Sequence, residues 1–444
     1  FYFSEKSIAK KIDVLLKYKT DSSRFDLQKI YHQIKKPDSN GIDLNEDQQK
    51  GILSCLQDKI TIITGGPGTG KTTLIKKLLE VLKNNKLKFR LAAPTGRAAK
   101  RMFEGTGCNT ETLHRMLEFN PTIMNFNKNE RDALDIDFLI VDEASMIDVF
   151  LMNSLLKAIP FNAHIVFLGD VDQLPSVGAG NILNDLINSK IIPTTKLTQI
   201  FRQAQDSLII VNAHKINNGE FPTSSIPGSK KDFFFIKENE PENIFPILHK
   251  IYKTTLPKYN ILPSKSIVLT PMNRGIAGTQ RINQELQMIL NPEEKNSIQI
   301  SRFGQIYRLG DRVMQIRNNY DKFVFNGDIG TIHDINPVDQ KIFINFGDRV
   351  LEYDFSELDE LVLSYSISIH KSQGSEFSAV IIPIFMQHFI LLQRNLIYTA
   401  ITRAKKLCIL IGQPKAIAMG IKNNKGVERN TFLKEFLTTD LEAR

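Results

Sequence analysis

The residues with the clearest chemistry form a glycine-rich loop in the first quarter of the chain. The run Gly65–Thr72 matches G-x-x-x-x-G-K-[ST], follows the apolar segment Ile60–Thr64 and precedes a helical pattern over Thr73–Leu82. Glycines let backbone N–H groups converge on a phosphate, and the helix N-terminus adds positive potential. We predict an ATP site in which Lys71 reaches the β- and γ-phosphates and Thr72 binds Mg²⁺. The predicted nucleotide ligands here are Gly66, Pro67, Gly68, Thr69, Gly70, Lys71, Thr72 and Thr73.

Polar side chains also follow two later apolar segments. Asp142 and Glu143 end the segment Phe138–Val141, which we expect to lie next to the strand before the glycine-rich loop. There Asp142 would hold Mg²⁺ through water, and Glu143 would polarise the attacking water. Gln173 follows the segment Ile165–Leu168 and offers both a donor and an acceptor to the γ-phosphate or the water. Together these groups predict ATP hydrolysis.

The elements that position these groups alternate between short strands and helices. Continuous apolar runs between helical stretches are typical of a parallel sheet covered on both faces. One set of runs comprises Ile60–Thr64, Phe89–Ala93, Phe138–Val141 and Ile165–Leu168, and a later set comprises Ile267–Thr270, Val380–Ile382 and Leu407–Ile411. The pattern predicts an α/β protein with two lobes.

Two insertions interrupt these lobes. Residues 118–135 contain Asn, Pro and Lys and form an excursion within the first lobe. Residues 305–359 contain Gly-Asp turns between short β-rich runs, which predicts a small antiparallel barrel. The first motor domain would then span 44–195, and the second would span 196–304 and 360–444.

Residues 1–43 are lysine-rich and polar, and Ser4 is expected to cap a helix over Glu5–Leu16. We expect this helical segment to be the end of a truncated N-terminal region, because the chain begins with Phe1 and not with Met.

The composition indicates a globular protein with a polyanionic partner. The net charge of +9 favours nucleic acid. Three widely spaced cysteines fit a reducing cytosol and exclude a disulfide framework. No apolar run approaches the length of about 18 residues that a membrane span needs, and no signal peptide is visible. We expect a cytoplasmic protein with no membrane partner.

The order of the motifs resembles that of superfamily 1 helicases. The matching blocks are Leu44–Gln48, Gly65–Thr72, Ala93–Ala99, Thr112–Arg115, Val141–Met146, Gly169–Pro175, Phe201–Gln203, Ile369–Phe377 and Tyr398–Ala404. Within that superfamily the chain is most similar to the stand-alone RecD-like (RecD/TraA) DNA helicases. The segments Gly310–Gln315, Arg317–Tyr320 and Phe325–Asp328 are similar to the inserted SH3-like barrel of those proteins.

The resemblance implies two RecA-like P-loop motor domains, with an inserted pin hairpin near 118–135 and an SH3-like β-barrel at 305–359. It implies a monomeric, ATP- and Mg²⁺-dependent motor that moves 5′→3′ along single-stranded DNA and unwinds DNA at single/double-strand junctions in recombination or repair. Gln48 would read adenine, Arg202 and Arg403 would neutralise the transferring phosphoryl group, and Gly374 and Glu376 would line the same site. The implied DNA contacts are Thr95, His114, Thr270, His370 and Lys371.

Two alternatives stay open. A superfamily 1 RNA helicase would share the motor core, and no single residue here forbids RNA. The chain could also be the motor subunit of a recombination nuclease complex. Because no Asp/Glu/Lys nuclease cluster is visible, the nuclease would then belong to a partner.

Overall fold

The computed structural model describes residues 1–18, 26–37, 43–200, 206–225, 232–293, 298–347, 349–424 and 429–442. The chain divides into two compact units, which comprise Phe1–Asp206 with Val427–Arg444, and Ser207–Gly426. The C-terminal segment therefore belongs to the first unit. This corrects the prediction that all of 360–444 belongs to the second motor domain. The physical reason is that Leu433 and Leu437 are buried in the first unit's core.

A six-stranded parallel sheet lies at the centre of the first unit, with the order β3-β2-β6-β7-β1-β8. Its strands are β1 (Ile60–Gly65), β2 (Phe89–Ala93), β3 (Thr110–Thr112), β6 (Phe138–Val141), β7 (His164–Gly169) and β8 (Thr194–Leu197). Successive side chains point to opposite faces of a strand. The side chains of Ile62 and Phe167 accordingly lie in the hydrophobic core on one face of the sheet. Those of Ile63 and Val166 lie in the core on the other face. The predicted double-sided parallel sheet is confirmed.

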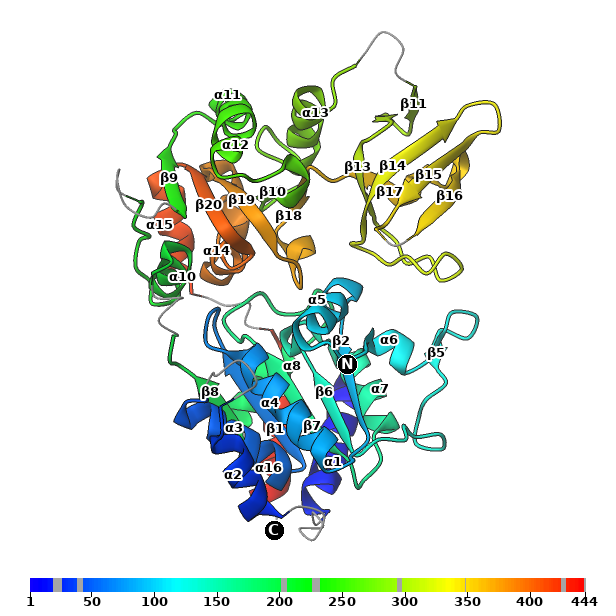
Figure 1. Ribbon diagram of the computed structural model, residues 1–444, viewed down its shortest axis with the longest axis vertical. Coiled ribbons are helices and arrows are strands. Elements are labelled where there is room, and N and C mark those ends of the chain that lie inside the picture. The colour runs from blue at the N-terminus through cyan, green and yellow to red at the C-terminus, as the bar shows by residue number, and fades with distance from the viewer. Residues whose placement is uncertain are drawn as a thin grey trace. The chain divides into compact units, whose positions relative to one another are not determined.

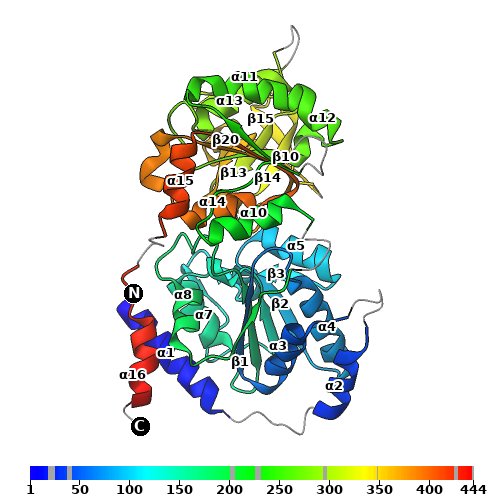
Figure 2. The ribbon, with the colours of Figure 1, turned by 90° about the vertical axis from the view of Figure 1, so that its left-hand side faces the viewer.

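Helices cover both faces of this sheet (Figure 2). One core contains side chains of α1 (Tyr2–Lys17), α7 (Val149–Ala158), α8 (Ile182–Ser189) and α16 (Leu433–Glu442). The other contains side chains of α2 (Leu27–Lys35), α3 (Glu46–Gln57), α4 (Lys71–Asn84) and α5 (Gly96–Thr106). The N-terminal helices are thus part of the first unit. Ser4 lies inside α1 and is not its cap, because the helix begins at Tyr2.

The strand order also corrects the predicted position of the acidic pair. Strand β7 pairs with both β1 and β6, so β6 is not adjacent to the strand that precedes the glycine-rich loop. Asp142 follows β6, and Asp170 follows the intervening β7. The carboxyl ends of all three parallel strands still meet at one edge of the sheet, where ligands of open α/β sheets bind.

The predicted excursion contains a short hairpin. Strands β4 (Phe119–Asn120) and β5 (Asn125–Phe126) pair antiparallel after the short helix α6 (Leu113–Met116).

A 3₁₀ turn, η2 (Ala144–Met146), follows the acidic pair Asp142 and Glu143.

The second unit has its own five-stranded parallel sheet, ordered β18-β10-β19-β20-β9 (Figure 1). Its strands are β9 (Phe233–Lys237), β10 (Ser266–Thr270), β18 (Ser366–Ser368), β19 (Phe377–Ile384) and β20 (Ala404–Gly412). Its helices are α10 (Leu208–Asn217), α11 (Ile244–Lys250), α12 (Leu256–Lys258), α13 (Thr279–Leu290), α14 (Arg394–Ile401) and α15 (Pro414–Lys422). It also contains a π-helical segment, η4 (Ile251–Thr255), and the 3₁₀ elements η3 (Pro241–Asn243), η5 (Pro263–Lys265), η7 (His370–Ser372) and η8 (Met386–Leu391).

An antiparallel sheet, drawn mainly in yellow in Figure 1, is inserted between β10 and β18. Its order is β16-β15-β14-β13-β17, with the bounds β13 (Arg312–Gln315), β14 (Ile329–Asn336), β15 (Lys341–Asn345), β16 (Val350–Asp354) and β17 (Leu361–Leu363). The turn η6 (Phe355–Glu360) links the last two strands, and the hairpin β11 (Gln299–Arg302)–β12 (Gln305–Arg308) precedes the sheet. The inserted β-domain therefore exists and extends slightly beyond the predicted limits of 305–359.

Candidate nucleotide and DNA sites

The glycine-rich loop joins the end of β1 to the first residue of α4. Gly68 and Gly70 have φ angles of 74° and 84°, a backbone region that side-chain-bearing residues seldom adopt. The Lys71 ammonium donates to the carbonyl oxygens of Gly65 and Gly66, the second at 3.1 Å. The Thr69 hydroxyl donates to Gly66 O at 2.9 Å. These bonds hold the loop in a folded-back shape whose amide groups can receive phosphate.

Gln48 supports this loop from helix α3. Its side-chain Nε2 donates to Gly70 O at 3.1 Å, and its Oε1 accepts from Asn45 N at 3.0 Å in a capping box. The side chain is fully buried. The adenine contact implied for Gln48 stays a prediction, whereas its support of the loop is a feature of the structure.

The acidic pair lies at the carboxyl end of β6. Glu143 has a φ of 52°, which is uncommon for a non-glycine residue. Its N–H donates to Asp142 Oδ1 at 2.8 Å. Burial, together with repulsion from Glu143, raises the pKa of Asp142, while Arg101 and Lys71 act in the opposite direction. The charge of Lys71 thus acts on Asp142.

The donor set at this edge suits Mg²⁺. Thr72 is exposed in the first turn of α4, and Asp142 supplies carboxylate oxygens after β6. Mg²⁺ prefers hard oxygen ligands and is held by one or two protein groups together with water and substrate phosphates. Thr72 and Asp142 are therefore the residues that would hold it, and the ion would neutralise phosphate charge there.

Gln173 lies in the loop after β7, at the same edge. Its Nε2 donates to Asp170 Oδ2 at 3.1 Å, and Asp170 is 2% exposed. Asp170 Oδ1 also accepts from Asp172 N at 3.1 Å. The structure thus brings the first unit's predicted hydrolytic residues to ends of strands on one sheet edge.

Arg101 is a residue of this site that sequence reasoning missed. It lies on α5, and its guanidinium donates to Glu143 Oε1 at 3.1 Å. The side chain of Glu143 is 8% exposed and that of Arg101 is 38% exposed. The sequence did offer one signal for this residue, because Arg101 is a basic residue six positions after Thr95 on the helix that follows the second strand.

The DNA residues predicted in the first unit lie at starts of helices after β2 and β3. Thr95 caps α5 and accepts from Ala98 N at 3.3 Å. His114 lies on α6 and packs against Phe119 and Phe126, with ring centroids 5.8 and 5.5 Å away. Burial lowers the pKa of His114, opposed in part by Asp148. His114 therefore supports the base of the hairpin.

The tip of the β4–β5 hairpin is apolar and exposed. Ile123 is 62% exposed and Met124 is 76% exposed. At the base, the rings of Phe119 and Phe126 pack with centroids 5.2 Å apart. The hairpin thus has a packed base and an exposed apolar end.

The second unit holds the remaining predicted residues. Arg403 is 2% exposed, and its guanidinium donates to Thr399 O at 3.2 Å and Ser375 O at 3.3 Å. Gly374 has a φ of 70°. Glu376 pairs with Lys405 at 2.9 Å. The nucleotide roles of Gly374, Glu376 and Arg403 stay predictions, and Arg202 lies outside the described residues.

Thr270 does not fit its predicted DNA contact. It is fully buried, and its hydroxyl donates to Ala277 O at 2.6 Å. Its place at the end of β10 serves to hold the following loop. His370 and Lys371 lie in η7 and are partly exposed, so their DNA contacts stay predictions.

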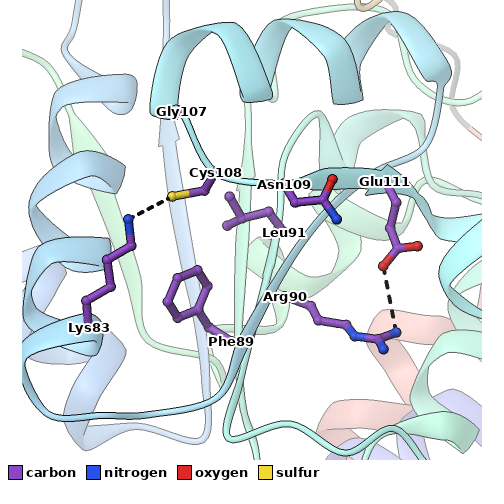
Figure 3. Close-up of a pocket in the computed structure, with 8 residues that line it drawn as sticks. All are labelled: Lys83, Phe89, Arg90, Leu91, Gly107, Cys108, Asn109 and Glu111. Carbon is purple, nitrogen blue, oxygen red and sulfur yellow. Dashed lines mark hydrogen bonds and ion pairs between the residues drawn. The ribbon is translucent and has the colours of Figure 1, made fainter.

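A separate pocket of about 510 Å³ lies at the amino-terminal part of β2, away from the carboxyl edge of the sheet (Figure 3). Lys83 Nζ lies 3.1 Å from Cys108 Sγ in its wall, and Arg90 pairs with Glu111 at 3.7 Å. None of the predicted nucleotide residues lines it. Cys55, Cys108 and Cys408 are all free and buried.

Within the described residues, no helix is both long and apolar enough to cross a bilayer.

Three protein-family descriptions match the chain in order. They are an AAA domain over residues 48–179, an ATP-dependent RecD-like DNA helicase SH3 domain over 282–346, and a UvrD-like helicase C-terminal domain over 363–411. The chain is 36% identical over 392 residues to the ATP-dependent RecD2 DNA helicase of Deinococcus radiodurans. The aligned region covers 88% of this chain and 52% of that protein. The chain belongs to the RecD-like family of superfamily 1 helicases.

Other comparisons agree with membership of the RecD-like family. The RecBCD enzyme subunit RecD of Buchnera aphidicola is 29% identical, over 85% of this chain and 74% of that protein. A crystal structure of Pif1 helicase from Bacteroides, in complex with ADP-AlF3 and ssDNA, matches with a TM-score of 0.52 and 20% identity. It covers 91% of this chain and 98% of that one, and confirms the two-lobed α/β fold. The chain spans about half the length of the RecD2 relative.

Proposed function

We propose that this RecD-like chain is an ATP-driven motor that moves 5′→3′ along single-stranded DNA and unwinds DNA during recombination or repair. The observation that carries the proposal is that Asp142, Glu143 and Gln173 follow β6 and β7 at the sheet edge where Lys71, the first residue of α4, follows β1 and the glycine-rich loop. The RecD-like SH3 domain match supports DNA as the track. The polarity rests on the family resemblance, since both polarities use the same ATP motifs.

The proposed reaction is hydrolysis of ATP to ADP and phosphate. The water oxygen forms a bond to the γ-phosphorus, and the bond from γ-phosphorus to the β,γ-bridging oxygen breaks, with its electron pair leaving on ADP. Glu143 takes the water's proton, and Gln173 orients the water. Lys71 stabilises the charge on the phosphates, and Thr72 and Asp142 would hold a Mg²⁺ that would supply further positive charge there.

The second unit is proposed to sense the nucleotide through arginine. Arg403, and Arg202 with it, would neutralise charge on the transferring phosphoryl group, a contribution worth about 10³–10⁵ in rate in other NTPases. Because Arg403 is bonded to carbonyl oxygens in this structure, its guanidinium would have to exchange those acceptors for phosphate. ATP binding and release would then shift the populations of two arrangements and produce steps.

The proposed DNA contacts in the first unit are Thr95, at the start of α5, and His114, on α6. In the second unit they are His370 and Lys371, in η7. The β4–β5 hairpin is proposed to act as the pin that separates the strands at a junction, because its exposed tip is apolar and its base is packed. We propose that the motor acts as a monomer, which rests on the family resemblance. We also propose a cytoplasmic location, because three free, buried cysteines fit a reducing compartment.

An RNA helicase is the main alternative, and a motor subunit of a recombination nuclease complex is the second. Steady-state ATP turnover is measured with single-stranded DNA and then with RNA oligomers of the same sequence. The comparison shows whether the motor moves along DNA or RNA. We expect DNA to stimulate turnover and RNA to do so weakly, with binding that weakens steeply as salt rises. A turnover rate unaffected by DNA would contradict the proposal.

A further inference from the structure

Helix α5 contacts the nucleotide site at two points along one face. Arg101 and Gly105 are four residues apart, so they lie on the same side of the helix. Arg101 donates to Glu143 Oε1 at 3.1 Å. A Cβ placed on Gly105 would lie 3.2 Å from Thr72 Cγ2, so the helix backbone comes close to that threonine. One face of α5 thus reaches the proposed catalytic base and a proposed Mg²⁺ ligand.

The same helix begins at a proposed DNA contact. Thr95 follows β2 and caps α5, and its hydroxyl accepts from Ala98 N at 3.3 Å. The helix then runs without interruption to Gly107, which ends it in a left-handed conformation. A movement of its N-terminal end therefore reaches Arg101 within two helical turns.

The bond from Arg101 restrains the group that must act on water. A general base has to present a carboxylate oxygen to the water within hydrogen-bond reach. Glu143 Oε1 is already an acceptor for Arg101, and its backbone is held by the bond from Glu143 N to Asp142 Oδ1. Release of the guanidinium would leave this oxygen available for water.

We propose that α5 couples DNA binding to ATP hydrolysis, with Arg101 as the positioning residue that restrains Glu143 until DNA binds at Thr95 and shifts the helix. The inference rests on the proposed DNA-stimulated motor function and adds the residue through which DNA acts. DNA must then bind more tightly to the arrangement in which the Arg101–Glu143 pair is broken, since only such a difference in affinity shifts the population.

Arg101→Gln tests the coupling, because glutamine removes the charged guanidinium and keeps much of the side-chain length. The matched control is Lys100→Gln, which removes the same charge from an exposed neighbouring position on α5. Each protein is assayed for ATPase at saturating ATP, without DNA and with saturating oligothymidine. We expect Arg101→Gln to raise DNA-free turnover about fivefold or more, the lower end of ordinary coupling between two sites. The ratio of DNA-stimulated to DNA-free turnover should fall towards one, and Lys100→Gln should keep the wild-type ratio.

DNA affinity supplies a second readout that a merely structural role would not move. By linkage, DNA no longer has to break the Arg101–Glu143 pair in the variant, so nucleotide-free Arg101→Gln should bind oligothymidine more tightly than Lys100→Gln in fluorescence anisotropy. The side chain of Glu143 is only 8% exposed, so loss of the guanidinium should lower the thermal midpoint of Arg101→Gln. The assays are therefore made well below that midpoint. If Arg101→Gln fails to fold, Arg101→Lys keeps the charge and should give intermediate DNA-free turnover.

Two results would overturn the inference while leaving the motor function in place. In one, wild-type ATPase is stimulated by DNA and Arg101→Gln keeps the wild-type ratio. In the other, Arg101→Gln loses turnover with and without DNA, which would make Arg101 an essential support of Glu143. A wild-type protein indifferent to DNA would instead refute the proposed function, and the inference with it.

Discussion

The ammonium of Lys71 donates a hydrogen bond of 3.1 Å to the carbonyl oxygen of Gly66, within the loop that is proposed to receive phosphate. A bound β- or γ-phosphate would offer this ammonium a charged acceptor in place of neutral carbonyls, and charge-assisted bonds are the stronger kind. The lysine therefore supports the folded-back loop through neutral carbonyls, and it would exchange them for phosphate when ATP binds.

Lys71→Ala should abolish ATP turnover and leave the fold intact. The change removes the charge that meets the phosphates, while the loop keeps the bonds from Thr69 and Gln48 to its carbonyls. Phosphate release measures turnover, and circular dichroism checks folding. Lys76→Ala, at an exposed position on the same helix, is the control and should behave as wild type. Turnover of the Lys71 variant at the wild-type rate would refute the assignment of this loop.

Glu143→Gln should bind ATP and lose hydrolysis. The amide keeps the size of the side chain but cannot take a proton from water, and a general base contributes about 10²–10⁴-fold to rate. Binding of a fluorescent ATP analogue and single-turnover hydrolysis separate the two effects. Glu104→Gln, exposed on α5, is the control. If the analogue no longer binds to the Glu143 variant, the residue supports the loop and does not act as the base.

The stability of the first unit should depend on pH through Asp185. Thr431 Oγ1 lies 2.7 Å from Glu5 Oε1 and 2.9 Å from Asp185 Oδ2, and a hydroxyl has one proton to donate. Burial raises the pKa of Asp185 to about 6. A carboxyl whose folded pKa is raised stabilises the fold below its unfolded pKa, and that contribution is lost as pH rises through the folded value.

Asp185→Asn should therefore increase the free energy of unfolding at pH 8 relative to wild type, by about 1–3 kcal/mol. The difference between the two proteins should shrink as pH falls from about 6 to about 4, because the wild-type carboxyl becomes protonated there. Urea unfolding at a series of pH values measures this difference. Asp13 forms an ion pair with Lys17 on α1. Asp13→Asn is the control, and its difference from wild type should not follow the titration of Asp185. A difference that does not vary with pH would show that Asp185 is not the titrating group.

The local parts of the fold could be predicted from the sequence, and the long-range parts could not. The glycine-rich loop and the strand Phe138–Val141 are determined by neighbouring residues, and both occur where the sequence predicts them. The return of the C-terminal segment depends on contacts such as Thr431 with Glu5, across nearly the whole chain. No local pattern around Thr431 indicates that partner.

The same difference explains the predictions for individual site residues. The family resemblance predicted a DNA contact for Thr270, but its burial and its bond to Ala277 follow from how β10 packs. Arg101 was missed because its partner, Glu143, is 42 residues away and is brought near only when α5 packs against β2, β3 and α4. Sequence motifs therefore identified the reactive side chains. Which of them interact with one another became known only from the folded structure.

Arg429 is the third case of a partner that only the fold reveals. Its guanidinium donates to Ser176 O at 2.5 Å and to Gly180 O at 2.6 Å, and also to Gly178 O. These carbonyls belong to the loop that follows Gln173. The C-terminal segment thus holds a loop next to the proposed hydrolytic residues, although about 250 residues of chain separate Arg429 from Gln173.

Unwinding should depend on the tip of the β4–β5 hairpin and on a 5′ single-stranded tail. A motor that pulls one strand needs an obstacle at the junction, or the strands reanneal behind it. Stacking costs on the order of 1–2 kcal/mol per base-pair step, so a passive apolar wedge beside the pulled strand is enough. The change should be confined to the tip, because Phe119 and Phe126 pack with His114 and Leu134 is buried in the core.

Ile123→Ser combined with Met124→Ser removes the exposed apolar tip and leaves the packed base. We expect DNA-stimulated ATPase to stay at the wild-type rate and unwinding of a 5′-tailed duplex to fall sharply, as a fluorescence-quenching assay would show. Exposed Val177, outside the hairpin, offers the control Val177→Ser. Unwinding at the wild-type rate by the double variant would exclude the hairpin as the pin. If the wild-type protein unwinds 3′-tailed duplexes and not 5′-tailed ones, the proposed polarity is wrong, while the ATP-driven motor stands, because the hydrolytic residues do not depend on the direction of travel.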